Sequence, residues 1–140
     1  MTEAVVVDTM VASAWLGIRH SQRQARWAPV LERMAWVLPF PVVAEMRFGA
    51  EVAGWGARRR GVLERLIHSA GVIPPLDPVV DAYVDLRTWA SRHGHGLAGK
   101  DHEADRWVAA VAIAAGLPLA TEDTIFDRLS SLQRITPDLD

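Results

Sequence analysis

The sequence predicts an α/β sandwich in which helices flank a short, mostly parallel central sheet, and it predicts a single domain spanning residues 1–140. Three observations support this fold class. Short apolar runs alternate with longer segments whose apolar residues recur at helical spacing. The first run, Ala4–Val7, is apolar at every position, which is typical of a central parallel strand covered on both faces. A chain of 140 residues is also the size of one compact domain.

The first half of the chain holds most of the predicted helices. Asp8 and Thr9 mark the end of the first strand, and Pro39 and Pro41 separate the second strand from a helix. Pro41 fits the first turn of that helix, where a missing N–H leaves no hydrogen bond unmade. The elements expected here are strands at 4–7, 37–38 and 72–73, and helices at 9–18, 24–36, 41–52 and 57–69.

The most apolar helix is predicted in the second half, from about Asp105 to Ala115. Because it has almost no polar face, we expect it inside the domain. Gly116 fits the left-handed position that ends a helix, and Pro118 prevents its continuation. The glycine-rich stretch His93–Gly99 looks flexible. The other elements expected here are helices at 79–92 and 127–132, and strands at 117–120 and 133–136.

Composition excludes several classes of protein. The chain has no cysteine, which rules out disulfides and thiolate metal sites. No apolar run approaches the roughly 20 residues of a membrane span, and the N-terminus lacks the basic segment of a signal peptide. We therefore expect a cytoplasmic protein without membrane association. The net charge is −2, but Arg58–Arg60 form a basic stretch that suits either nucleic acid or a solvated helix face.

Four carboxylates follow strand ends or open helices in this predicted arrangement. Asp8 ends the first strand and Asp123 follows a late one, while Glu45 and Asp105 lie early in helices. In open parallel sheets, ligands bind beyond the carboxyl ends of the strands. If the strands are parallel, the four side chains converge at one edge of the sheet.

Clustered carboxylates repel one another and cannot all stay ionised in a dry pocket. Mg²⁺ and Mn²⁺ prefer oxygen ligands and relieve this repulsion. Such an ion lowers the pKa of a water and stabilises charge on a phosphodiester, which is the chemistry of a metal-dependent nuclease. Taken singly, each acid has a structural explanation. Asp8 suits a helix cap, Asp105 a first helical turn, Glu45 a solvated helix face and Asp123 a turn.

Three motifs carry a family resemblance. They are Val5–Val11, Val43–Gly49, and Ala104–Ile113 continued by Leu117–Asp123, and together they span nearly the whole chain. In these motifs the chain resembles the PIN-domain ribonucleases, and specifically the VapC-type toxins of bacterial and archaeal toxin–antitoxin pairs. The resemblance implies a PIN-like α/β/α sandwich. It also implies a Mg²⁺-dependent endoribonuclease, with Mn²⁺ as a substitute, that cleaves structured RNA such as tRNA or rRNA.

The resemblance also assigns roles to residues. It makes Asp8, Glu45, Asp105 and Asp123 the acidic catalytic residues. Asp8 and Asp105 would ligate the metal, and the other two acids would bind it directly or through water. Thr9 and Thr121 match hydroxyl positions near the family's acidic centre. Arg58, Arg59 and Arg60 become candidate RNA contacts.

The chain departs from the family pattern at one point. Many relatives have a second Asp two positions after the one that matches Asp123, where this chain has Ile125. Asp127 is a partial substitute or, as we prefer, the cap of a last helix. Asp101 lies four residues before Asp105, so a helix that began early would place both on one face. At most, Asp101 would act through Asp105 rather than bind the metal itself.

The resemblance further implies protein partners. A VapB-type antitoxin would cover the acidic pocket with its tail, often inserting an Arg, and the toxin would form a homodimer. Trp15, Trp36 and Trp55 suit such a contact surface or an ordinary core. The alternative function is a PIN-like module that binds RNA or protein without cleaving it.

Two other patterns are weaker. Gly94–Lys100 matches part of a phosphate-binding loop, but a predicted helix precedes it where a strand is required, and Asp101 replaces the metal-binding Ser or Thr. His93, His95 and His102 are spaced too loosely for a typical zinc site.

Overall fold

The computed structural model describes residues 3–17 and 21–137. Its centre is a five-stranded sheet in the order β3-β2-β1-β4-β5, and every neighbouring pair is parallel. The strands are β1 (Ala4–Val7), β2 (Ala35–Pro39), β3 (Gly71–Ile73), β4 (Leu119–Ala120) and β5 (Arg134–Ile135). The predicted α/β fold with a mostly parallel sheet is confirmed.

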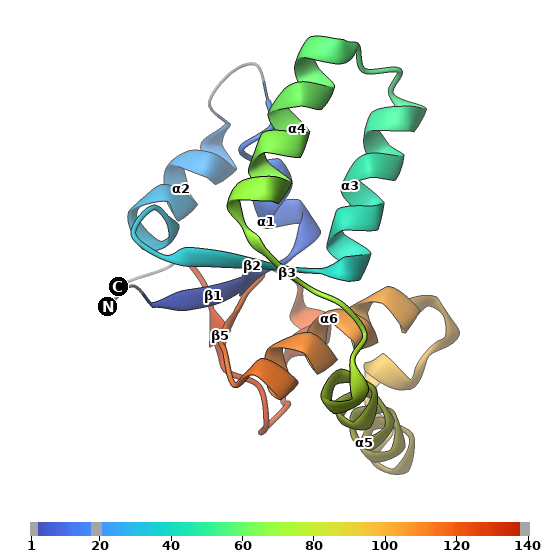
Figure 1. The fold of residues 1–140 in the computed structure, drawn as a ribbon. Coiled ribbons are helices and arrows are strands. Elements are labelled where there is room, and N and C mark those ends of the chain that lie inside the picture. Colours follow the sequence, from blue (N-terminus) through green and yellow to red (C-terminus); the bar gives the residue numbers. More distant parts are fainter. Residues whose placement is uncertain (1–2, 18–20, 138–140) are drawn as a thin grey trace.

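Helices cover both faces of this sheet. They are α1 (Thr9–Ser13), α2 (Gln22–Leu31), α3 (Phe40–Val52), α4 (Ala57–Ser69), α5 (Asp77–His93) and α6 (Glu103–Ala115). Figure 1 shows α1 to α4 on one side of the sheet and α5 and α6 on the other. Short 3₁₀ turns, η1 (Gly96–Ala98), η2 (Lys100–His102) and η3 (Thr124–Phe126), lie in the loops before α6 and after β4.

The core lies in the two layers between sheet and helices. Val5, Val6 and Val7 of β1 are fully buried, as expected for a strand covered on both faces. In α6, every residue from Val108 to Ala112 is buried, which confirms the prediction of an internal helix. Gly116 ends α6 with φ at 66°, a conformation that glycine adopts without a Cβ penalty.

Parallel pairing aligns the carboxyl ends of the strands. Val6 and Val7 of β1 pair with Leu119 and Ala120 of β4, so both strands end at the same edge of the sheet. Strand β2 leads into α3 at this edge, and Pro41 lies in the first turn of α3 as predicted. The residues that follow β1, β2 and β4 are therefore brought together.

Two predicted helix ends were wrong. The helix expected at 24–36 ends at Leu31, because the chain from Ala35 onwards pairs with β1. The Leu31 carbonyl at the helix end accepts from the Met34 N–H at 3.1 Å and from the Trp36 indole at 3.2 Å. The helix expected at 9–18 ends at Ser13, and its last predicted residue lies outside the described residues.

The predictions for two further stretches, residues 93–99 before α6 and residues 127–132 after β4, also need correction. No helix forms at 127–132, where Arg128 has the left-handed φ of 63°. The stretch 93–99 contains η1 and the fully buried Leu97, so it is packed rather than open. A helix precedes Gly94–Lys100, which removes the phosphate-loop interpretation. Among the residues that the structure describes, no helix has the length and apolar character needed to cross a membrane.

Candidate active site

Asp8 lies where β1 ends, half-buried and held on both carboxylate oxygens. Its Oδ1 accepts a hydrogen bond from the Thr9 backbone N–H at 2.8 Å. Its Oδ2 accepts one from the Thr121 hydroxyl, also at 2.8 Å, and Thr121 is fully buried just after β4. Asp8 thus caps α1, as its structural explanation required, and also joins the ends of two neighbouring strands.

Two further carboxylates approach Asp8 from other elements. Glu45 of α3 accepts a hydrogen bond from the Thr9 hydroxyl at 2.8 Å. Burial raises the pKa of Asp8, and the nearby charges of Asp105 and Glu45 raise it further, while the bonds from Thr121 and Thr9 only partly offset them. The structure therefore brings together Asp8, Glu45 and Asp105 at the carboxyl edge of the sheet.

Asp105 has a partner that the sequence did not predict. Its Oδ2 lies 2.8 Å from Nδ1 of His102, one turn earlier in the chain. The Asp123 backbone N–H donates to the Thr121 hydroxyl at 3.1 Å. Because that hydroxyl also donates to Asp8, Thr121 links Asp123 to Asp8. The Asp123 carboxylate accepts from the Ile125 N–H at 3.0 Å, in agreement with a turn-forming role, and lines a hollow beside His102.

The supporting acids lie farther from this group. The Asp127 carboxylate pairs with Arg134, and the Asp127 carbonyl lies 2.8 Å from Nε2 of His95. No helix follows Asp127 in the described part of the chain, so it does not cap one, and its carboxylate is paired with Arg134. Asp101 is exposed in η2, and its carboxylate has no hydrogen bond to another described residue.

The three arginines of α4 differ in their surroundings. Arg58 is exposed. Arg59 lies 3.9 Å from the centre of a Trp55 ring and lines a groove that it shares with Thr9 and Glu45. Arg60 is engaged by Glu51 at 3.0 Å and by the Trp55 carbonyl at 2.7 Å. Of the three, Arg59 is therefore the one beside the carboxylates.

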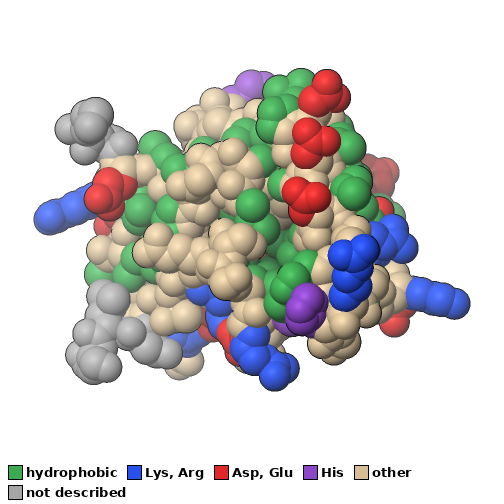
Figure 2. Space-filling view, turned by 90° about the horizontal axis from the view of Figure 1, so that it is seen from below, with side chains coloured by type: hydrophobic (Ala, Val, Ile, Leu, Met, Phe, Trp, Pro, Cys, Tyr) green, Lys and Arg blue, Asp and Glu red, His purple; other side chains and the backbone are tan. Residues whose placement is uncertain are grey.

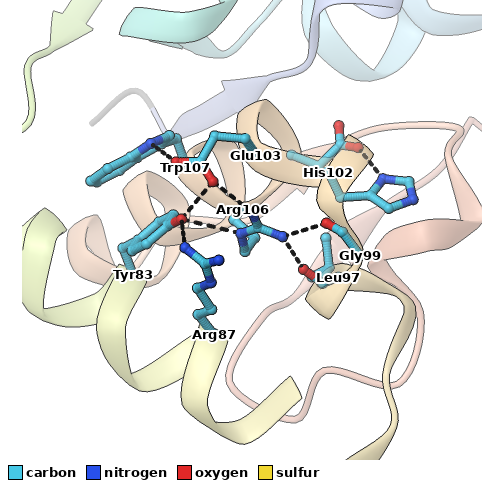
Figure 3. A network of polar contacts seen from close by, with 9 residues as sticks. Tyr83, Arg87, Leu97, Gly99, His102, Glu103, Arg106 and Trp107 are labelled. Carbon is cyan, nitrogen blue, oxygen red and sulfur yellow. Dashed lines mark hydrogen bonds and ion pairs between the residues drawn. The ribbon is translucent and has the colours of Figure 1, made fainter. Parts of the chain in front are cut away.

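A buried arginine fixes the loop before α6, and the sequence analysis missed it. The Arg106 side chain is 2% exposed, and one Nη1 donates to the carbonyls of Leu97 at 2.6 Å and Gly99 at 2.7 Å. Its other nitrogens reach the Tyr83 hydroxyl at 3.2 Å and Glu103 at 2.5 Å (Figure 3). Hydrogen bonds from Tyr83 and Arg106 lower the pKa of Glu103. An Arg inside so apolar a helix was the available signal, because buried charges need partners.

Glu122 anchors the loop after β4 in a similar way. It accepts hydrogen bonds from Arg23 at 2.6 Å, Arg26 at 2.8 Å and the Trp27 indole at 3.1 Å, all on α2. Burial alone would raise its pKa, but these donors lower it overall. Because Glu122 lies between Thr121 and Asp123, it holds both in place. No local pattern in the sequence indicates this contact.

Asp8, Glu45 and Asp105 together are called the carboxylate group. Their oxygen ligands and negative charges suit a hard divalent cation. Asp8 is half-buried beside two other acids, and such a cluster gains most from an added positive charge. In residues 3–17 and 21–137, however, no three acidic or histidine side chains already stand around a common point as ligands. Glu45 and Asp105 each have one carboxylate oxygen engaged, by Thr9 and His102 respectively.

Another groove among the described residues lies elsewhere. It encloses about 550 Å³ and shares no residue with the carboxylate group; its lining includes Asp81, Asp85, Leu86 and Trp89 of α5. Figure 2, which views the molecule from the side of α5, shows a row of acidic side chains beside hydrophobic ones. This groove is separate from the candidate active site.

Comparisons with known proteins agree with this geometry. The PIN domain matches residues 5–132. Toxin FitB of Neisseria gonorrhoeae is 33% identical over 126 residues, 86% of this chain and 88% of that protein. VapC ribonuclease Y4jK of Sinorhizobium fredii is 32% identical over 141 residues, 95% of this chain and 96% of that protein. A similar fold occurs in the crystal structure of VapBC2 from Rickettsia felis bound to a DNA fragment from their promoter. One chain of that structure has a TM-score of 0.78, covering 95% of this chain and 98% of that chain. Because the two chains are 17% identical, this likeness supports the fold alone.

A parallel sheet with acids gathered at its carboxyl edge, and a match over residues 5–132, define the class of protein. The chain belongs to the PIN domain family. Its relatives there include a toxin and a VapC ribonuclease, so the resemblance to VapC-type toxins is confirmed.

We expect Asp8→Asn to stabilise the metal-free protein at neutral pH. Burial raises the folded-state pKa of Asp8 above its unfolded value of about 3.9. The stability from this group is therefore complete below the unfolded pKa and is lost as the pH rises through the folded pKa. Asn carries no charge to repel its neighbours.

Thermal unfolding in EDTA checks this expectation. The melting temperature of Asp8→Asn should rise by about 2–4 °C at pH 7, the scale of roughly 1 kcal/mol for a chain of this size. The gain should shrink towards pH 4. The exposed Asp85→Asn on α5 serves as the matched control, and a fall in the melting temperature of Asp8→Asn alone would contradict the argument.

Proposed function

We propose that this chain is the toxin of a toxin–antitoxin pair and a Mg²⁺- or Mn²⁺-dependent endoribonuclease that cleaves structured RNA such as tRNA or rRNA. The observation that carries the proposal is the approach of Asp105 and Glu45 to the half-buried Asp8. Two relatives, one a toxin and the other a VapC ribonuclease, support it.

The catalytic roles follow from the positions of the side chains. Asp8 and Asp105 would hold the cation, with Glu45 and Asp123 binding directly or through water. When bound, the cation supplies a lower pKa for the attacking water and stabilises charge on the phosphodiester. Thr121 orients Asp8, and Thr9 orients Glu45.

Asp127 has a supporting role in this proposal. It fixes the loop after β4 through Arg134 and His95. Asp101 has no comparable contact, and we leave it outside the site.

The proposal includes protein partners. A VapB-type antitoxin is expected from the VapC-type resemblance, and a chain of a VapBC structure shares the fold. A homodimer is also expected, and Phe48 and Val52 of α3 offer apolar surface for it, at 69% and 71% exposure. Trp15, Trp36 and Trp55 instead pack against the core. Sedimentation equilibrium that found only monomers would exclude the dimer.

We expect Asp105→Asn to abolish RNA cleavage. The amide keeps the shape of the side chain but removes a charge that the cation needs, so the rate should fall on the order of 100-fold or more. The assay uses purified, antitoxin-free protein with Mn²⁺ and total cellular RNA, and EDTA should stop cleavage equally.

Asp85→Asn is the control and should cleave at the wild-type rate. Activity that survives Asp105→Asn would mean that the metal site is misassigned. Absence of cleavage by folded wild-type protein would instead favour the alternative function, a PIN-like module that binds RNA or protein without cutting it.

We expect Arg59→Gln to weaken RNA binding. Arg59 lines the groove next to Thr9 and Glu45, where it can contact an RNA phosphate, whereas Arg60 is already paired. Measured in EDTA, affinity should fall roughly threefold to tenfold, and the slope of log affinity against log salt should decrease by about 1.

Arg33→Gln is the matched control for this measurement, because exposed Arg33 precedes β2 and so lies towards the opposite edge of the sheet. An equal loss of affinity in both variants would show only a general charge effect and would exclude a specific role for Arg59. Arg58→Gln should have a smaller effect than Arg59→Gln.

A further inference from the structure

A second hollow lies beside the carboxylate group. It encloses about 470 Å³ between the loop before α6 and the loop after β4. His95, Gly96 and His102 line it from the first loop, and Asp123 and Arg128 line it from the second. Of the four acids proposed for catalysis, only Asp123 lines it.

Hydrogen bonds hold the wall of the hollow that the loop before α6 forms. His95 accepts from the Leu97 N–H at 3.0 Å through Nδ1 and donates to the Asp127 carbonyl at 2.8 Å through Nε2, so both of its ring nitrogens are engaged. Arg106 holds the same loop from inside by its bonds to Leu97 and Gly99 (Figure 3). A preformed pocket loses little entropy on binding.

The two loops also touch each other closely. A Cβ at Gly96 would lie only 2.7 Å from Cδ1 of Ile125. Glycine at position 96 therefore allows the loop before α6 to lie against η3.

The hollow is continuous with the proposed catalytic group. Asp123 lines it directly, and His102, which also lines it, lies 2.8 Å from Asp105. An RNA chain that placed a phosphate at Asp8 and Asp105 would therefore have a neighbouring nucleotide next to this space.

The hollow presents one exposed cation. Arg128 forms no ion pair with any other described residue, whereas the adjacent Asp127 is neutralised by Arg134. Arg128 also has a φ of 63°, a left-handed conformation that is unfavourable for a residue with a Cβ. Such strain persists only where the surrounding structure enforces it, and it is concentrated at functional sites.

We propose that this hollow binds one ribonucleotide of the RNA, next to the scissile phosphate. The Arg128 guanidinium contacts its phosphate, and the His102 ring lies against its sugar or base. Guanidinium groups suit phosphate because their donors match its oxygens, and imidazole rings accept stacked bases. This inference rests on the proposed nuclease function and identifies a substrate subsite for it.

Titration of ¹⁵N-labelled protein with the four ribonucleoside 5′-monophosphates tests the subsite without cleavage. In EDTA, we expect chemical-shift changes at the amides of residues 95–97 and 123–128. Arg128→Gly removes the guanidinium and relieves the backbone strain, so it should fold and lose at least fivefold in affinity. Arg128→Lys keeps the charge and should lose less. Arg92→Gln on α5 is the matched control and should bind as the wild type does.

Each outcome decides the proposal. Shifts confined to the two loops and weakened by Arg128→Gly support the subsite. Equal shifts with inorganic phosphate alone would indicate a general anion site and overturn it, as would shifts elsewhere or binding unaffected by Arg128→Gly. If the nucleotides bind here but the protein never cleaves RNA, the subsite stands and the nuclease function fails. If the protein cleaves RNA but the nucleotides cause no shifts in the hollow, the nuclease function stands and the subsite fails.

Discussion

The hydrogen bond between the Thr121 hydroxyl and Asp8 is the contact on which the rest of the site depends. It joins β1 and β4 at the point where both strands end, and it fixes one carboxylate oxygen of Asp8. Parallel pairing is what makes this contact possible, because only then do both strand ends lie at one edge. Thr9 extends the same linkage to Glu45 on α3.

Gathering carboxylates in a half-buried place opposes folding, and the surrounding structure compensates for it. Burial and the charges of Asp105 and Glu45 raise the pKa of Asp8. The fully buried β1 valines supply apolar stabilisation beneath this edge. Arg106 and Glu122 hold the two loops that carry His102 and Asp123.

Much of the fold was predictable because it follows from local patterns. The apolar run before Asp8 predicted a covered parallel strand, and Gly116 with Pro118 predicted the end of α6. The convergence of Asp8, Glu45 and Asp105 followed from strand ends and from the motifs. The end of α2 and the partners of Arg106 were not predictable, although an Arg inside so apolar a helix indicated a buried charge. Both depend on contacts with other segments of the chain, which no periodicity reports. The bond between His102 and Asp105 joins residues only three apart, but the motifs do not specify it.

The central claim is that the carboxylate group at this edge is a metal site. Titration with Mn²⁺, followed by the loss of the free-ion signal in electron paramagnetic resonance, tests it most directly. The account predicts binding of one or two ions by the wild type, binding at least tenfold weaker in Asp8→Asn, and unchanged binding in Asp85→Asn. Equal affinity in wild type and Asp8→Asn, or no binding by the folded wild type, would contradict it.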